Sequence, residues 1–255
     1  MAVVLDRATF RASGRDTRAY LQSMLTQDVE AIPEGSGAYA LLLTPKARVI
    51  ADVEVFAVDG TLVLALPPAV ADDAVRTLET ARFRKKVVFE PAPEVVVWQG
   101  DTGLAEFATP AGTLVLAAQA PARPEPADRW QVARVEAGMP EFGIDFDGSS
   151  MPAEAGLEDR AISFTKGCYP GQEPVARLHY RGHANRGLRG LRHAGEPPAR
   201  GTPVVQDGRE VGRTGSAAVS ERFGPIGLAV LRREVADGAL VVAGGAATVT
   251  ALPFA

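Results

Sequence analysis

The first third of the chain alternates apolar and polar positions with the period of a β-strand. This pattern predicts strands over residues 3–10, 39–43, 49–58 and 61–66, with a hairpin turn at Asp59-Gly60. Within residues 49–58 the alternation divides the side chains between two faces. One face carries Val49, Ala51, Val53 and Val55, and the other carries Ile50, Asp52, Glu54 and Phe56. A pair of carboxylates on one face can do acid–base chemistry, but it is more typical of a sheet face in contact with water.

Helical spacing of apolar residues marks three further segments. The first follows Asp16, a candidate N-cap, and ends near Gln27 and Asp28. The second covers residues 71–81, with aspartates early and a basic run late, an order that suits the helix dipole. The third starts at Trp130 and runs into residues 134–138. Strands are expected at 87–89, 95–98 and 113–117.

Beyond residue 185 the pattern changes to short β-prone runs that alternate with turns. These runs cover residues 202–206, 211–215, 226–231, 239–243 and 247–252. Evenly spaced short strands of this kind predict a small antiparallel barrel. The chain of 255 residues is long enough for two or three packed units, so such a barrel leaves room for a larger N-terminal region.

Composition narrows the classes of function. The net charge of −4 gives no general attraction to nucleic acid or to anionic lipid. A single cysteine makes no internal disulfide, so we expect a reducing, cytoplasmic location. Asp6 and Arg7 come too early for the apolar region of a signal peptide. Because no apolar run approaches the roughly 20 residues that cross a bilayer, we expect no membrane partner.

The only cysteine, Cys168, lies in the segment Lys166-Gly-Cys-Tyr-Pro-Gly-Gln-Glu173, which reads as a tight loop between short apolar segments. A thiolate beside the ammonium of Lys166 would have a lowered pKa and a higher reactivity. The alternative is a small apolar side chain buried in the core, which is the commoner role of a lone cysteine.

Residues 174–195 contain no acidic residue but hold five arginines and all three histidines, namely Arg177, Arg181, Arg186, Arg189, Arg192, His179, His183 and His193. This basic block could contact RNA phosphates through residues 177–192, bind the glutamate tail of a folate, or form an ordinary solvated face. No metal-binding motif surrounds His179 and His183, so we predict no metal site.

The loop at 166–173 resembles the signature K-G-C-[FY]-x-G-Q-E of the YgfZ-type folate-binding proteins, which are relatives of the glycine-cleavage T-protein, an aminomethyltransferase. Shorter stretches along most of the chain resemble the same relatives: residues 134–138, 152–157, 208–216, 226–229 and 252–254. The resemblance implies an α+β, T-protein-like fold. It would have a folate-binding region over 1–185, made of two mixed α/β subdomains with a boundary near 90, and a C-terminal antiparallel β-barrel over 186–255.

The resemblance also implies a function: a tetrahydrofolate-binding accessory protein for the assembly or repair of iron–sulfur enzymes, including tRNA-modifying ones. The ligand would be tetrahydrofolate or a one-carbon or polyglutamyl derivative. Glu136 is expected to hold the aminopyrimidine edge of the pterin, because a carboxylate accepts two parallel N–H bonds. Tyr39 is expected to pack on the ring, and Asp52 to lie near its reactive edge.

Four more residues complete the expected site. Lys166, Gln172 and Arg177 are expected to help bind the cofactor, and Cys168 to face the pocket or a partner. An alternative function is a folate-dependent aminomethyltransferase or demethylase. It is weakened by Ala51, which stands where the T-protein has a second aspartate, and by the cysteine signature, which T-proteins lack. A second alternative is a tRNA-binding protein that uses the basic block.

Overall fold

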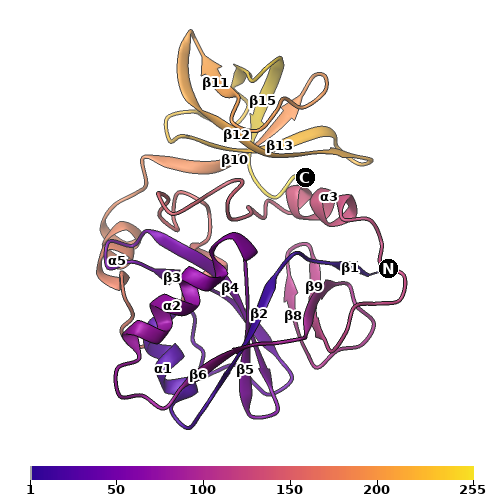
Figure 1. The fold of residues 1–255 in the computed structure, drawn as a ribbon. Helices are drawn as coiled ribbons and strands as arrows, with labels where there is room; N and C mark the ends of the chain where they lie inside the picture. Colours follow the sequence, from indigo (N-terminus) through magenta and orange to yellow (C-terminus); the bar gives the residue numbers. More distant parts are fainter. Residues whose placement is uncertain (1) are drawn as a thin grey trace.

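The computed structural model describes residues 2–255, and its strands form a five-stranded sheet, a four-stranded sheet and a closed barrel (Figure 1). All the strand pairs in these three groups are antiparallel. The five-stranded sheet has the order β3-β4-β5-β2-β6. Its strands are β2 (Ala8–Ser13), β3 (Gly37–Leu43), β4 (Val49–Val58), β5 (Thr61–Leu66) and β6 (Val88–Pro91).

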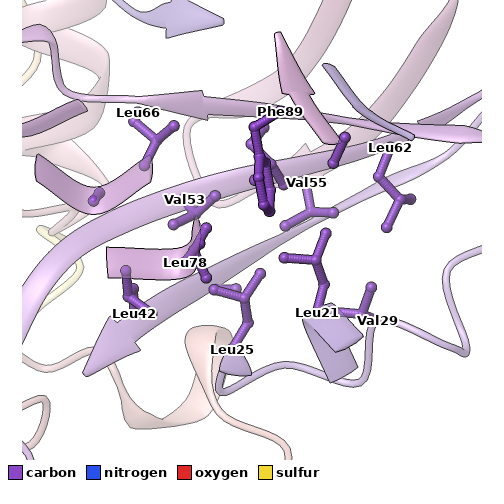
Figure 2. Close-up of a cluster of buried hydrophobic side chains, with 14 of the residues drawn as sticks. Leu21, Leu25, Val29, Leu42, Val53, Val55, Leu62, Leu66, Leu78 and Phe89 are labelled. Carbon is purple, nitrogen blue, oxygen red and sulfur yellow. The ribbon is translucent and has the colours of Figure 1, made fainter. Parts of the chain in front are cut away.

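Two helices, α1 (Thr17–Met24) and α2 (Ala71–Ala81), cover one face of the five-stranded sheet; a 3₁₀ turn, η1 (Pro68–Val70), leads into α2. Figure 2 shows leucines of these helices gathered against the valines of β4, with Phe89 beside them. The alternation predicted for β4 is confirmed from Ala51 onward, because Ala51, Val53 and Val55 all belong to this core. It is wrong at the start of the strand, where the β3–β4 register shifts: Ile50 packs against this core and Val49 lies in a different buried cluster. Burial of this apolar area is the main force that holds the layer together.

The four-stranded sheet packs on the opposite face of the five-stranded sheet and has the order β1-β7-β9-β8. Its strands are β1 (Val3–Val4), β7 (Val95–Trp98), β8 (Ala105–Thr109) and β9 (Gly112–Ala117). Phe56 and Val63 of the first sheet meet Trp98 and Leu116 of the second in one buried cluster. The sheet face that carries Asp52 and Glu54 is therefore covered by protein.

The predicted single strand over residues 3–10 is wrong, because the segment forms two strands in different sheets. β1 pairs with β7, whereas β2 pairs with β5 and β6. Between them the chain turns at Arg7, whose backbone N–H donates to the carbonyl of Leu5. This turn brings the Arg7 side chain to the junction of the two sheets.

The C-terminal strands close into a six-stranded barrel in the order β10-β13-β12-β11-β14-β15, which confirms the predicted antiparallel barrel. The strands are β10 (Arg186–His193), β11 (Pro203–Gln206), β12 (Arg209–Ser220), β13 (Gly224–Arg232), β14 (Leu240–Val242) and β15 (Ala246–Thr250). In Figure 1 the barrel, in orange and yellow, lies at one end of the molecule above α3. Together with the helices and sheets below it, it makes the fold α+β as expected.

Three helices connect the sheets to the barrel: α3 (Asp128–Glu136), α4 (Glu158–Ala161) and α5 (Gln172–Arg181). α3 contacts β12 and β13 of the barrel. A separate buried cluster joins Leu41 and Val49 of the first sheet to Leu157, Tyr169 and Val175 of the connecting segment. Among the helices of residues 2–255, none combines the length and the apolar character that a membrane crossing requires.

Two local expectations need correction. Asp52 and Glu54 are each only 3% exposed, so the face that they share does not contact water. Asp16 does occupy the N-cap position of α1, but its side chain makes no capping bond. It accepts a hydrogen bond from the backbone N–H of Lys86 instead, which ties the start of α1 to the segment before β6.

Candidate functional site

A cleft of about 800 Å³ opens where the two sheets, the β1–β2 turn and α3 meet. Its walls are largely apolar, and their larger members are Val3, Leu5, Phe107, Leu114, Trp130, Met139 and Phe142. Aromatic and aliphatic walls of this kind suit a flat, partly apolar ligand, and the volume lies within the range of small-molecule sites.

Polar side chains form one end of the cleft, which we call the floor: Arg7, Tyr39, Asp52 and Glu54. The Arg7 guanidinium donates to both carboxylates, reaching Asp52 Oδ1 at 3.2 Å and Oδ2 at 2.8 Å as well as Glu54 Oε1. The Tyr39 hydroxyl donates to Asp52 Oδ2 at 3.0 Å. Alternation along β4 puts both carboxylates on the same face, and Tyr39 lies opposite Glu54 in the β3–β4 register.

Burial dominates the electrostatics of the floor. It raises the pKa of Glu54 to about 7, a shift that the negative charge of Asp52 increases and the positive charge of Arg7 opposes. Burial also raises the pKa of the Tyr39 hydroxyl, so Tyr39 is a neutral donor at physiological pH. The two carboxylates raise the pKa of Arg7 against the effect of its own burial, which keeps the guanidinium charged. Arg160 lies 4.9 Å from the centre of the Tyr39 ring.

The wall opposite the floor is fixed to the barrel through Arg134 on α3, a side chain that is only 1% exposed. Its guanidinium donates to the Ser216 hydroxyl of β12 at 2.7 Å and to Asp145 Oδ2 at 3.3 Å, and it pairs with Glu141 at 2.7 Å. Asp145 in turn accepts from the backbone N–H and the hydroxyl of Ser216. The barrel thus determines where the α3 wall of the cleft lies.

The comparisons with known proteins agree with this architecture. A family model for the CAF17 C-terminal β-barrel domain matches residues 185–254. The chain is 29% identical to the tRNA-modifying protein YgfZ of Yersinia enterocolitica, in an alignment that covers 98% of this chain and 90% of YgfZ. It is 28% identical to the mitochondrial iron-sulfur cluster assembly factor IBA57 of Mus musculus, covering 92% of this chain and 78% of IBA57. Over most of its length the chain is therefore similar to YgfZ and to IBA57.

Comparison with a solved structure identifies the fold of the chain. The glycine cleavage system aminomethyltransferase T of Bartonella henselae matches with a TM-score of 0.82 and 18% identity. The match covers 100% of this chain and 86% of that one. The T-protein-like fold expected from the YgfZ-type resemblance is therefore confirmed.

The YgfZ-type signature loop supports the cleft from outside. Lys166 is buried, and its ammonium donates to the backbone carbonyls of Gln22, Leu25 and Gln27, with Nζ 2.6 Å from Leu25 O and 3.0 Å from Gln27 O. Gln27 itself lines the cleft. The lysine expected to act beside the thiol thus holds a segment of the cleft wall.

The other residues of the signature region lie outside the cleft lining as the structure describes it. Cys168 is an exposed free thiol, so it is not the buried apolar side chain of the alternative interpretation. Gln172 is the first residue of α5 and is half-buried, and Arg177 is exposed on the same helix. Gly171, with a φ of +83°, lets the chain turn into α5 against the backbone of Thr44 and Ala47.

Glu136, the expected pterin anchor, is also missing from the described residues that line the cleft. Its carboxylate accepts a hydrogen bond from the Ser220 hydroxyl and lies 3.7 Å from the Arg222 guanidinium, both on the barrel side. Its backbone carbonyl accepts from the N–H of Phe254. Glu136 therefore sits between the end of α3 and the barrel.

The arginines of the basic block do not gather around one site. Arg181 ends α5, Arg189 pairs with Asp237 at 3.6 Å, and Arg192 stacks on the rings of Phe223 and Phe254. Among the histidines, His179 stacks on Phe164 with the ring centres 4.0 Å apart. The basic block, which is continuous in the sequence, is thus distributed over α5 and β10 in the structure.

Reasoning from sequence missed three residues that shape the cleft: Arg7, Glu54 as a buried floor residue, and Trp130 as a wall. The signal for Glu54 was present, because it shares a strand face with Asp52, but only Asp52 was predicted to belong to the site. Arg7 gave no signal, since its position depends on the turn that separates β1 from β2.

Proposed function

We propose that this protein binds a reduced folate in the cleft and serves as an accessory factor for the assembly or repair of iron–sulfur enzymes, including tRNA-modifying ones. The observation that carries the proposal is a cleft with apolar, partly aromatic walls and a buried hydrogen-bonding floor. The relatives support the wider role, since one is named an iron-sulfur cluster assembly factor and another a tRNA-modifying protein. A single cysteine favours a cytoplasmic location for this activity.

The residues present fit a folate. Trp130 and Phe107 would pack on its flat rings, and Tyr39 and Asp52 would lie at the polar edge. Glu54 keeps a buried carboxylate oxygen without a partner among the described residues, which a polar ligand would satisfy. A bound tetrahydrofolate supplies a carrier for one-carbon groups. The proposal also keeps Glu136 as a candidate anchor of the pterin, for which it must first release Ser220, and Gln172 and Arg177 as further contacts to the ligand.

Calorimetric titration with tetrahydrofolate tests the proposal. We expect saturable binding by the wild type, a loss of about tenfold or more in affinity for Trp130→Ala, and no change for Arg76→Ala on the exposed side of α2. Glu136→Ala tests whether Glu136 or the cleft floor anchors the ligand, because the variant should bind more weakly only if Glu136 moves into the cleft. Absence of binding by folded wild-type protein to tetrahydrofolate and its polyglutamyl forms would refute the folate proposal.

Cys168 is proposed as a group that acts at the surface, toward a partner or the rim of the cleft, because the thiol is exposed. We expect Cys168→Ser to retain folate affinity but to lower the activity of an iron–sulfur client enzyme in cells that depend on this protein. An unchanged client activity would remove the cysteine from the proposal.

The alternative function, folate-dependent aminomethyl transfer, is favoured by the fold shared with aminomethyltransferase T and by Asp52 at the floor. Ala51 weakens it, since this residue belongs to the core on the opposite face of β4 and supplies no second carboxylate. Formation of methylene-tetrahydrofolate from an aminomethyl donor separates the two. Robust turnover that is lost in Asp52→Asn would replace the accessory role by the enzymatic one.

A further inference from the structure

The cleft floor has one positive charge too few. Two buried carboxylates, Asp52 and Glu54, share the single guanidinium of Arg7. Two other cations line the cleft, and among the described residues neither pairs with these carboxylates: Arg160 lies over the ring of Tyr39, and Arg134 is paired with Glu141 and Asp145. Asp6, the other charged residue of the lining, is exposed and acidic. Such a deficit is costly in a buried site unless a proton or a ligand supplies the missing positive charge.

The unused hydrogen-bonding capacity of the floor is concentrated on one atom. Both oxygens of Asp52 are occupied by Arg7, and Oδ2 also accepts from Tyr39. Glu54 Oε1 accepts from Arg7, whereas Oε2 is buried and has no hydrogen-bond partner among the described residues. A carboxylate oxygen accepts but does not donate, so what fits beside it is a donor.

We propose that Glu54 Oε2 is the acceptor for an N–H group of the bound ligand, and that the cleft selects ligands with an amino-substituted edge. With a single oxygen free, Glu54 takes one N–H rather than the parallel pair that a free carboxylate would bind. For a folate, the edge in question is the aminopyrimidine ring, so in that form the inference rests on the proposed function. The inference makes Glu54 on β4 the residue that binds the aminopyrimidine edge, whereas the family resemblance implies Glu136.

The protonation of Glu54 gives the inference a pH signature. Because Glu54 Oε1 accepts from Arg7, a proton on this carboxyl resides on Oε2 and turns it into a donor, so a ligand N–H can bind there only when Glu54 is ionised. Burial raises the pKa of Glu54 to about 7. Below that pH the cleft must release a proton when the ligand binds, so affinity falls by about tenfold per pH unit. Above it the carboxylate is already ionised and affinity is constant. A ligand that accepted a bond from the protonated acid would show the opposite trend.

The test is a calorimetric titration of the full-length protein with tetrahydrofolate and with its 2-desamino analogue, from pH 5.5 to 8.5. The variants are Glu54→Gln and, as a matched control on the exposed face of α2, Glu79→Gln. For the wild type and the control we expect weakening below pH 7 and weak binding of the desamino compound. Glu54→Gln should bind tetrahydrofolate at least tenfold more weakly than the wild type at pH 8. Its affinity should depend little on pH and differ little between tetrahydrofolate and the 2-desamino analogue.

Two further measurements keep the outcome decisive. If Glu54→Gln does not fold, proton release by the wild type at pH 6, measured in buffers of different ionisation enthalpy, replaces the variant. If the wild type does not bind tetrahydrofolate, the folate proposal fails on its own, and benzamidine becomes the amidine probe for Glu54. Any one of three results would overturn the inference. The first is a folded Glu54→Gln variant with wild-type affinity and pH dependence. The others are the absence of proton release by the wild type and the failure of both benzamidine and tetrahydrofolate to bind.

Discussion

At the scale of single residues, burial decides what a polar side chain does in this protein. Asp52 and Glu54 follow an alternation typical of a sheet face in water, yet the second sheet packs on that face and both carboxylates are buried. The desolvated carboxylates then depend on Arg7, a residue about 45 positions away in the chain. Lys166 is a similar case, because burial turns a signature lysine into a donor to three backbone carbonyls.

Lys166→Met tests this structural role. The carbonyls of Gln22, Leu25 and Gln27 lose their shared donor, so we expect the free energy of unfolding in urea to fall by about 2 kcal/mol at pH 7. Lys46→Met, at an exposed lysine, is the control and should change little. A destabilisation no larger than that of the control would contradict the role.

Lys166 also predicts a pH dependence. Burial lowers its pKa from 10.5 to about 8, so between these values the unfolded chain binds more protons than the folded one. The contribution of this group to stability therefore rises as the pH increases from 8 to 10.5. The Lys166→Met variant should lack this rise, which urea unfolding at several pH values measures against the wild type.

At the scale of elements, close backbone contact constrains the pairing of β12 with β13 in the barrel. Gly212 on β12 lies opposite Leu231 of β13, and a Cβ on Gly212 would come within 2.3 Å of the Val230 carbonyl oxygen. Its backbone does not have a positive φ, so the requirement for glycine here is steric. Two strands therefore approach so closely that no side chain fits between them.

Gly212→Ala should destabilise the barrel by about 3 kcal/mol, because the added methyl group forces β12 and β13 apart. Gly195→Ala is the matched control, since a Cβ there has open space around it. Urea unfolding monitored by circular dichroism compares the two variants. Equal stability of the two would mean that the strands adjust without cost.

At the scale of the whole molecule, the cleft exists because the barrel holds α3 against the sheets. Arg134, Asp145 and Ser216 form the buried link between α3, the connecting segment and β12. Trp130 and Gln131, which line the cleft, lie on the same helix as Arg134. The position of the α3 wall, and with it ligand affinity, therefore depends on contacts outside the cleft.

Asp145→Ala should cost about 3–5 kcal/mol in stability, because it leaves the buried Arg134 guanidinium without its buried partner. We also expect ligand affinity to fall, since the α3 wall is released. Asp147→Ala, at an exposed aspartate two residues further on, is the control. Urea unfolding and calorimetric titration measure the two effects, and a variant with control-like stability would refute the link.

The sequence by itself determined most of the elements, because their patterns are local. The alternation in residues 49–58, the helical spacing in 71–81 and the turn-separated runs after 185 each predicted an element that the structure contains. The signature at 166–173 also pointed to the YgfZ-type relatives. Hydrophobic periodicity and turn residues act over a few positions, so they can be read directly from the chain.

Only the tertiary structure decided what the elements bring together. The split of residues 3–10 between two sheets places Arg7 beside Asp52 and Glu54, and the packing of α3 against the barrel brings Trp130 and Arg134 to the same cleft. The same packing puts Glu136 against Ser220 of the barrel. Burial, and therefore charge state and hydrogen-bonding partners, depends on surfaces contributed by distant parts of the chain, which no local pattern contains.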